Sequence, residues 1–449
     1  MKDSARIFII VALFALFVLA LGLSRASCGP EVVSSAADGA ASLASSDAAV
    51  AKEAGAELPA RCTRTTAEAP LEGGDSFEVG GAELSASEIT VAASLSRDGG
   101  REGVVFQADL ALSKVRATDL GELAGGDLVP RLATCSACGG RVVVASYSVS
   151  AAGPKSFGNV AGKARAAAQR TLVVSALEGG KATPIVRLPQ QADESAAFDL
   201  SLVDKDSGIV AWDEDSDRVV RGIVKVASFG GGKPGKPVVV SPYETDADSP
   251  KIVRTARGEV FVGWIAREVF GTDGGAADAD LQGAYLEAPG EERAHQWIEI
   301  VELDATGKPR GTPVAVTARG RGFASSFELV GTSDGVDVLV VDGAVRQDGL
   351  GSRVLRVPVR AGRPGAAFEL VSSGSGAASA TVFGAFVTFV DVSERSMIVA
   401  LEPPHAVSRE PLARGGRFVA AVGSTFYSVG VDGADGGVPT AVLRRHDCP

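Results

Sequence analysis

The chain has 449 residues, of which 45% are hydrophobic, 6% are aromatic and 55 are glycine, and its formal net charge is -11. This length suits two or three ordinary domains or one large repeat fold. The acidic balance excludes the basic footprint of a nucleic-acid-binding protein, so we expect no nucleic-acid partner. Valine-rich segments separated by glycine favour strands and tight turns over helices.

The N-terminus has the layout of an export signal. Lys2 and Arg6 form a basic end, residues 7–23 are an unbroken apolar run, and small residues precede Cys28. This pattern predicts that residues 1–27 are a signal peptide or an anchor. It places the rest of the chain outside the cytoplasm, on the periplasmic side of the envelope or at the outer membrane or cell surface.

Three interpretations of this segment remain open. Ala26 and Ser27 before Cys28 resemble the lipobox of bacterial lipoproteins, which implies that Cys28 is acylated and begins the mature chain. Cleavage after Ala26 would instead release a chain without lipid. An uncleaved segment would stay as an anchor, because its apolar run is close to the shortest helix that spans a bilayer. We favour lipidation, so the membrane is an expected partner through the N-terminus.

Residues 28–59 are a flexible tether in our interpretation. They consist mostly of Ala, Ser, Gly and acidic residues, with no aromatic residue. Such a segment cannot bury enough apolar surface to offset the entropy of ordering. The folded part is therefore expected at residues 60–449.

The folded part is organised around a repeated pair of strands with a short turn in its middle. We expect these pairs at Glu88–Phe106, Val129–Val149, Ala197–Asp213, Pro250–Ile265, Ser326–Asp342, Ala377–Asp391 and Arg417–Val431. A second hairpin usually follows, with a turn rich in Gly, Lys or Arg, and Pro, as in VVSALEGGKATPIVRL and RVLRVPVRAGRPGAAFELVSS. Two hairpins make a unit of roughly 50–55 residues, the period of four-stranded propeller blades.

The segments Asp199–Asp217 and Pro250–Trp264 carry this pattern most clearly, and with them the chain resembles exported, lipoprotein-type β-propeller proteins. The resemblance implies an all-β fold of seven four-stranded blades, with six or eight as alternatives. It also implies a ring that must join its last blade to its first. Trp212, Trp264 and Trp297 are expected in the core.

Five cysteines leave one over if all the others pair. If Cys28 carries lipid, the remaining four are expected to form Cys62–Cys448 and Cys135–Cys138, which an oxidising compartment permits. The first bond would hold the N-terminal strand on the last blade. The second would staple the turn of a strand pair, and a redox motif or a metal site is the alternative for this CxxC.

Two long insertions, Ala151–Gln169 and Glu268–Gln296, both fall between the second and third strands of a unit, so both should rise from one face of the ring. Long ordered loops in a compact fold are usually functional. Second strands also tend to end in an acid, as at Asp342 and Asp432, and we expect these acids at the mouth of the central channel. The binding face predicted from these features comprises Asp213, Glu214, Arg267, Glu268, Asp273, Asp278, Asp280, Lys155 and Lys163.

The sequence favours a binding or scaffold module of the cell envelope whose partner is a protein or a glycan. The alternative is a glycan-active hydrolase or lyase that uses two acids at the channel mouth. No HExxH or phosphate-binding loop is present, and no catalytic residue is assigned. We expect no cofactor and no metal, with Ca²⁺ on the three Asp of the second insertion as the alternative.

Overall fold

The fold is that of a computed structural model, which describes the chain from residue 65 to residue 447 with gaps. The gaps are 74–75, 98–99, 124–128, 136–137, 139, 150–169, 191–196, 217–220, 268–294, 320–323, 344–352, 372–376, 384–385, 392–395, 402–415, 423–424 and 433–439. Contacts divide the chain into residues 1–53 and residues 54–449. Everything below concerns the second unit, whose described elements are all strands.

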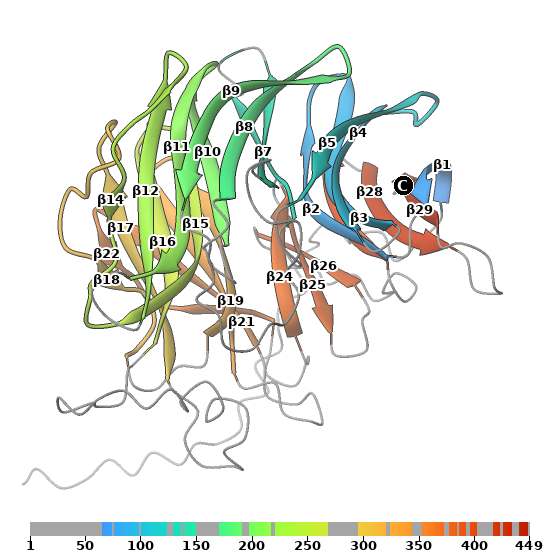
Figure 1. Ribbon diagram of the computed structural model, residues 1–449. Coiled ribbons are helices and arrows are strands. Elements are labelled where there is room, and N and C mark those ends of the chain that lie inside the picture. The colour runs from blue at the N-terminus through green and yellow to red at the C-terminus, as the bar shows by residue number, and fades with distance from the viewer. Residues whose placement is uncertain are drawn as a thin grey trace, which may run out of the picture. The chain divides into compact units, whose positions relative to one another are not determined.

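The strands form seven antiparallel sheets, which we call blades and number in chain order (Figure 1). Blade 1 contains β2 (Ser76–Leu84), β3 (Glu88–Arg97), β4 (Gly100–Asp109) and β5 (Val115–Glu122). Blade 2 contains β6 (Arg131–Cys135), β7 (Arg141–Val149), β8 (Arg170–Glu178) and β9 (Lys181–Gln190). Blade 3 contains β10 (Phe198–Asp204), β11 (Ser207–Asp215), β12 (Gly222–Gly230), β13 (Lys233–Pro234) and β14 (Val238–Val239).

Blades 4 to 7 repeat this order. Blade 4 contains β15 (Asp246–Arg254), β16 (Val260–Arg267), β17 (Gln296–Leu303) and β18 (Val314–Ala315). Blade 5 contains β19 (Ala324–Gly331), β20 (Gly335–Asp342), β21 (Arg353–Arg360), β22 (Arg363–Pro364) and β23 (Phe368–Val371). Blade 6 has three described strands, β24 (Ala377–Phe383), β25 (Phe386–Asp391) and β26 (Ser396–Ala400). Blade 7 contains β27 (Arg417–Val422), β28 (Thr425–Asp432), β29 (Thr440–Asp447) and β1 (Thr65–Gly73).

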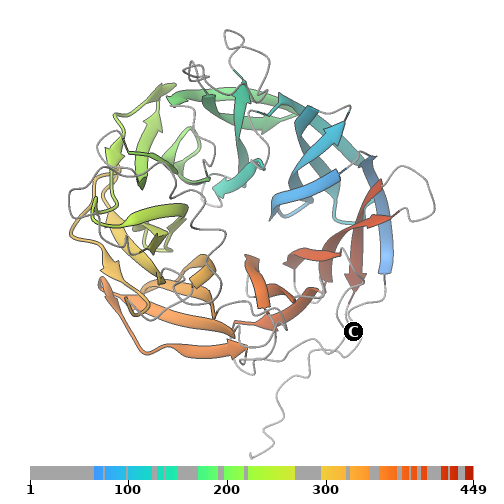
Figure 2. The same cartoon turned by 60° about the horizontal axis from the view of Figure 1, so that its bottom comes forward.

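The blades are arranged in a ring (Figure 2), and we call the region around its axis the channel. The first strand of each blade contacts the first strands of the two neighbouring blades, so these seven strands surround the axis. The described residues form seven hydrophobic clusters, and each cluster combines side chains from two adjacent blades. The core therefore lies between the blades, and the predicted seven-bladed β-propeller is confirmed.

The tryptophans show why these strands belong in the interior. Trp212, Trp264 and Trp297 are at most 3% exposed, as the sequence predicted. Trp264 lies in β16, where every residue but the last is buried. Strands covered on both faces have continuous apolar runs, and VFVGWIA is such a run.

The N-terminal strand closes the ring. Strand β1 pairs antiparallel with β29, so it supplies the outermost strand of blade 7 and joins the start of the propeller to its end. The prediction that the N-terminal strand is held on the last blade is confirmed. The proposed bond Cys62–Cys448 lies outside the described residues.

The two faces of the ring differ in their connections. Turns between first and second strands and between third and fourth strands lie on one face, which we call the turn face. Connections between second and third strands lie on the other face, the insertion face. Residues 150–169 connect β7 to β8 and residues 268–294 connect β16 to β17, so both insertions join second to third strands as predicted.

Blade 1 corrects one prediction. The expected inner pair Glu88–Phe106 corresponds to β3 and β4, which are the second and third strands, and the first strand is β2. Gly80 and Gly81 interrupt β2, where a bulge follows Val79, so the strand pattern is weak in the sequence. A Cβ at Gly80 would lie 2.0 Å from the carbonyl oxygen of Pro130, which shows how closely blades 1 and 2 approach there.

Candidate functional site

Two of the predicted binding residues are buried at the end of β11. Asp213 is 4% exposed and Glu214 is 7% exposed. Glu214 accepts a hydrogen bond from Nε1 of Trp212 at 2.8 Å and forms an ion pair with Lys225. Oδ2 of Asp213 accepts a hydrogen bond from the backbone N–H of Ser249 in the next blade at 2.9 Å. Both acids therefore connect strands.

Arg267 ends β16 and lies beside the start of β15. Its Nη1 is 3.4 Å from Oδ2 of Asp246, and it forms a second ion pair with Asp248. Burial raises the pKa of Asp248, and the charge of Arg267 opposes this shift. Strand β15 carries a bulge at Ser249, whose φ is 54°. Because Ser249 also donates to Asp213, the bulge brings Asp213 and Arg267 to one junction between blades 3 and 4.

Other predicted site residues fall outside the described part of the chain. They are Cys28, Cys62, Lys155, Lys163, Glu268, Asp273, Asp278, Asp280 and Cys448. Two of the other acids at the ends of second strands have partners within their own blades. Asp342 pairs with Arg353 at 3.0 Å and Asp432 pairs with Arg444, and both arginines lie on third strands, away from the axis. Neighbouring strands therefore neutralise these acids within their own blades.

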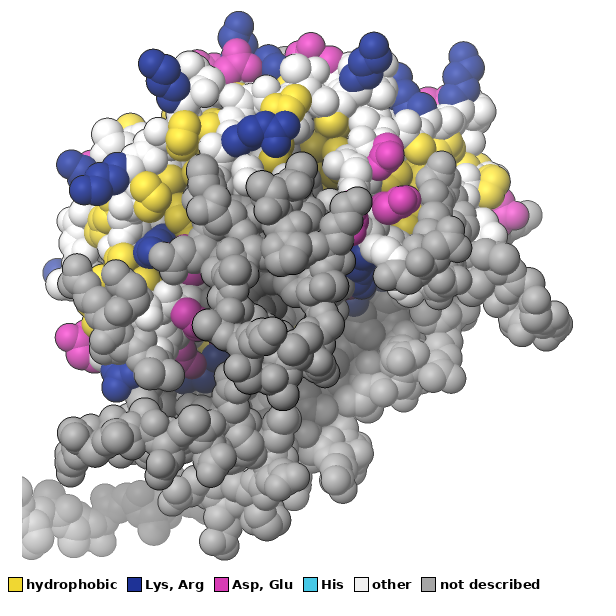
Figure 3. All heavy atoms as spheres, viewed as in Figure 1, with side chains coloured by type: hydrophobic (Ala, Val, Ile, Leu, Met, Phe, Trp, Pro, Cys, Tyr) yellow, Lys and Arg dark blue, Asp and Glu magenta, His cyan; other side chains and the backbone are white. Residues whose placement is uncertain are grey.

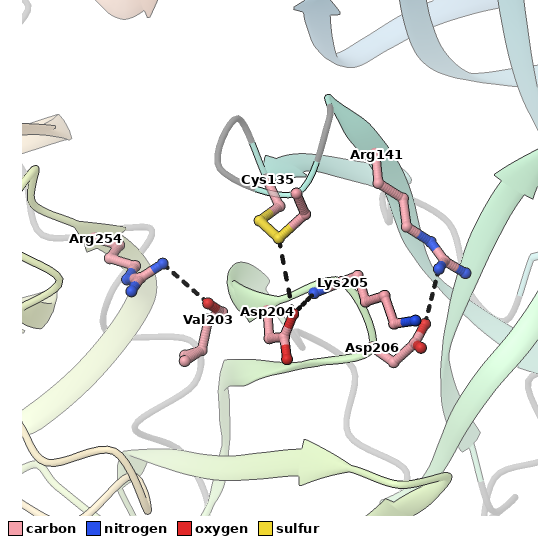
Figure 4. The surroundings of a disulfide bond; sticks show 8 residues. Cys135, Arg141, Val203, Asp204, Lys205, Asp206 and Arg254 are labelled. Carbon is pink, nitrogen blue, oxygen red and sulfur yellow. Dashed lines mark hydrogen bonds and ion pairs between the residues drawn. A yellow bond between two sulfur atoms is a disulfide. The ribbon is translucent and has the colours of Figure 1, made fainter.

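The predicted disulfide between Cys135 and Cys138 is present in the turn between β6 and β7. Sγ of Cys138 lies 3.9 Å from Oδ1 of Asp204, in the corresponding turn of blade 3 (Figure 4). Nη1 of Arg141, at the start of β7, is 3.0 Å from Oδ1 of Asp206 in that same turn. The disulfide thus shapes a turn that contacts the next blade.

A cavity of about 220 Å³ at the insertion-face mouth of the channel collects charged side chains from first strands. Arg131 of β6, Lys251 of β15 and Glu328 of β19 line it, and Nζ of Lys251 is 2.8 Å from Oε1 of Glu328. Nη1 of Arg131 donates to the carbonyl oxygen of Gly80 at 2.7 Å. The first strands of blades 2, 4 and 5 thus place two cationic side chains and one carboxylate around the same cavity.

Asp199 of β10 stands next to this cavity, between its lining residue Phe198 and the strand β15. Its two carboxylate oxygens accept backbone hydrogen bonds from Leu200 and Ile252, each at 3.0 Å. Burial raises the pKa of Asp199, while the charges of Lys251 and Arg131 oppose the rise. The carboxylate is therefore coupled to the two cations of the cavity.

Glu83, near the end of β2, carries a strongly perturbed carboxyl group. Burial raises its pKa from 4.5 to about 7, and the charge of Asp199 adds to the rise. A hydrogen bond from Oγ1 of Thr134, at 3.1 Å, opposes it. The side chain of Glu83 is half-buried, so it is packed against protein on one side and remains partly accessible to water. Such a carboxyl exchanges its proton near neutral pH.

Arg417, the first residue of β27, adds a cation on the blade 7 side of the channel. Burial lowers the pKa of Arg417 and the charge of Arg131 lowers it further, whereas Glu78 opposes the shift. Arg131 and Arg417 belong to the strands that flank β2. The channel wall around blade 1 therefore carries two guanidinium groups that act on each other.

The sequence contained a signal for these channel residues that the prediction did not use. Several inner strands carry a charged residue among apolar ones, as at Asp199 in FDLSLVD, Lys251 in PKIVR and Glu328 in SSFELV. Alternate residues of a strand face opposite sides, so such a residue between buried neighbours can point into the channel. The predicted binding face was drawn from the insertions and the ends of second strands, so it did not include these charged residues of the first strands.

The arrangement is suited to holding a polar ligand through ion pairs and hydrogen bonds. Within the described ranges, no group of three or more His, Cys, Asp or Glu has the geometry of a metal site. In that same part of the chain, no helix is long and apolar enough to cross a bilayer.

Comparisons with known proteins find likeness only among solved structures. No protein-family model matches the chain, and no curated protein matches it. The polysaccharide lyase Uly1 is similar in structure, with a TM-score of 0.46 and 10% identity over 84% of this chain and 91% of that one. The propeller domain of the Trilobed protease from Pyrococcus furiosus is similar with a TM-score of 0.44 and 9% identity over 82% of this chain and 93% of that one. The Dos1 propeller is similar with a TM-score of 0.42 and 11% identity over 86% of this chain and 96% of that one.

Proposed function

We propose that this protein is an exported β-propeller of the bacterial cell envelope that binds a polar ligand, a glycan or a protein segment, at the insertion-face mouth of its channel. The observation that carries the proposal is the set of charged side chains around one cavity, Arg131, Asp199, Lys251 and Glu328, supplied by four consecutive blades. Hydrogen-bonding groups of both signs suit hydroxyl, amide and carboxylate groups of a ligand.

Stability alone does not account for these residues. Lys251 is 20% exposed and Glu328 is 21% exposed, and desolvating such a pair offsets much of the attraction between its charges. Apolar residues of similar volume would pack the inner strands at no such cost. A bound polar ligand would form ion pairs and hydrogen bonds with these charged groups, which accounts for their presence on the inner strands.

Binding is tested on an array of envelope glycans and peptides with three proteins. Lys251→Gln removes one cavity cation and is expected to lower binding of each array ligand at least tenfold, since hydrogen bonds to charged groups contribute about 1.5–3 kcal/mol. Arg116→Gln is the matched control, because Arg116 forms an ion pair with Glu88 at the same 2.8 Å outside the channel. Array ligands that bind both variants like the unchanged protein would place the site elsewhere.

Export and anchoring are a separate part of the proposal. The basic end, the apolar run and Cys28 support cleavage before Cys28 and acylation of its thiol. The disulfide between Cys135 and Cys138 fits an oxidising compartment. The intact mass of the mature chain from a bacterial host should equal residues 28–449 plus acyl groups, and a mass beginning at Met1 or Ser27 would contradict acylation.

Glu83 supports a second candidate function, a glycan-active hydrolase or lyase. An acid with a pKa of about 7 next to the carboxylate of Asp199 has the property of a general acid at neutral pH. Reducing-end assays on envelope polysaccharides test this function. Turnover that Glu83→Gln and Asp199→Asn each abolish would establish the enzyme, and absence of product with every polysaccharide would leave the binding module.

A further inference from the structure

A cation occupies the same place in the third-to-fourth turn of five consecutive blades. This cation is the first residue after the turn. It lies opposite the last residue of the third strand, or opposite the residue that follows that strand. Glu178 pairs with Lys181, Gly230 with Lys233 and Arg360 with Arg363 in strand register. In blades 1 and 4 the same place is held by a lysine whose carbonyl oxygen accepts from the turn's first N–H. The five residues are Lys114, Lys181, Lys233, Lys308 and Arg363.

The backbone of these turns fixes that place. Blades 2, 3 and 5 use two residues with positive φ, namely Gly179–Gly180, Gly231–Gly232 and Ala361–Gly362. This is the pattern of the two-residue turn that suits the twist of a hairpin. Gly307 has positive φ in the longer turn of blade 4. The cation therefore begins the return strand in blades 2, 3 and 5, and it directly precedes β5 in blade 1 and the bridge residue Pro309 in blade 4.

The five cations face solvent. All five are exposed, and none forms an ion pair with another described residue. The nearby acids Asp109 and Asp304 are bound within their own turns, where Asp109 accepts from Ser113 and Asp304 accepts from Thr306 and Lys308 backbone N–H groups. Figure 3 shows Lys and Arg side chains standing out along the edge at which the β4–β5 and β8–β9 turns lie in Figure 1.

The chain enters the propeller on this same face. Thr65 begins β1 opposite His446, near the end of β29, and Asp447 lies opposite Thr425, which follows the turn between β27 and β28. The start of β1 therefore lies on the turn face. Any segment that precedes Thr65 continues from the face that carries the five cations.

We propose that the turn face docks on an anionic lipid bilayer through Lys114, Lys181, Lys233, Lys308 and Arg363, while the channel mouth on the opposite face stays open to its ligand. The chain as a whole has a net charge of -11, so a bilayer of anionic lipid would repel the protein in most orientations. Cations spread along an arc of the rim match a flat surface, which can meet all of them at once. A linear polyanion would meet only a few.

Vesicle sedimentation tests the proposal with residues 54–449, which form one compact unit closed by β1 and carry no apolar leader. The unit should bind vesicles of phosphatidylcholine with about 30% phosphatidylglycerol and should not bind phosphatidylcholine alone. Each cation near such a surface contributes roughly a fivefold gain in partition. Lys181→Gln with Lys233→Gln should therefore lower partition roughly 30-fold, and about 0.5 M salt should abolish it.

The control removes the same charge elsewhere. Arg187→Gln with Arg353→Gln removes two described cations away from these turns, in the outer strand β9 and at the insertion-face start of β21, and should leave partition unchanged. Equal loss in both double variants would show that net charge alone governs binding and would overturn the proposal. So would equal binding to neutral vesicles, or binding to dextran sulfate in the absence of binding to anionic vesicles. Melting temperatures within about 2 °C of the unchanged unit establish that the variants are folded.

Discussion

Replacing Glu83 by a glutamine tests the electrostatics of the channel. The pKa of Glu83 is raised from 4.5 to about 7 by burial, so in the folded protein its carboxyl keeps a proton that the unfolded chain releases. Below pH 4.5 both states are protonated and the group costs nothing. As pH rises toward 7, the unfolded chain ionises first, and stability is lost.

The magnitude follows from this shift. A rise of about 2.5 in the pKa on folding corresponds to a maximum loss of about 3 kcal/mol in folding stability, reached when the pH exceeds both pKa values. At pH 5 the loss is about 1 kcal/mol, and at pH 8 it is about 3 kcal/mol. The amide in the Glu83→Gln variant would be neutral at every pH and would keep an oxygen for the Thr134 hydroxyl. An unfolding entropy of about 0.8 kcal/mol/K for a propeller of this size converts 3 kcal/mol to about 4 °C.

Scanning calorimetry of residues 54–449 at pH 5 and pH 8 measures the effect. Glu83→Gln should melt about 3–4 °C above the unchanged protein at pH 8 and about 1 °C above it at pH 5. Glu88→Gln is the control, because it removes an exposed ion pair with Arg116 and should shift melting by less than about 1 °C. The reasoning is refuted if Glu83→Gln gives no gain at pH 8, or the same gain at both pH values.

Three further predictions concern the architecture. Gly80→Ala should lower stability by about 1–3 kcal/mol in chemical denaturation, since its Cβ would lie 2.0 Å from a backbone oxygen of blade 2, while Gly81→Ala, whose Cβ meets nothing closer than 4.0 Å, should be much milder. Removing residues 65–73 should expose β29 and speed proteolysis of blade 7; an unchanged cleavage rate would contradict closure by β1. Cys135→Ser with Cys138→Ser should cost about 2 kcal/mol, and an unchanged melting temperature would show that the disulfide adds nothing to the turn.

The sequence predicted the blades because their signals are local. Apolar runs such as VFVGWIA and turns such as Gly231–Gly232 mark strands and hairpins without knowledge of distant contacts. Blade 1 was assigned one strand too late because Gly80 and Gly81 weaken β2, and only the packing of blade 2 against them explains the glycines. The closing role of β1 followed from the need to complete a ring.

The channel site was harder to predict because it depends on register between blades. Whether Lys251 faces the channel is decided by the bulge at Ser249, since a shift of one residue turns a side chain to the other face of its sheet. The coupling of Glu83 to Asp199 joins strands more than one hundred residues apart. Acids at the ends of second strands were visible in the sequence, but their arginine partners on third strands were not.

The central claim is that the channel mouth on the insertion face holds the ligand. It is tested most directly by a crystal structure of the propeller with the tightest ligand from the glycan and peptide array. The account predicts ligand density in the cavity lined by Arg131, Lys251 and Glu328, with ligand oxygens or nitrogens at hydrogen-bond distance from these side chains. Density on the turn face or along the outer strands, with the cavity unchanged, would contradict it.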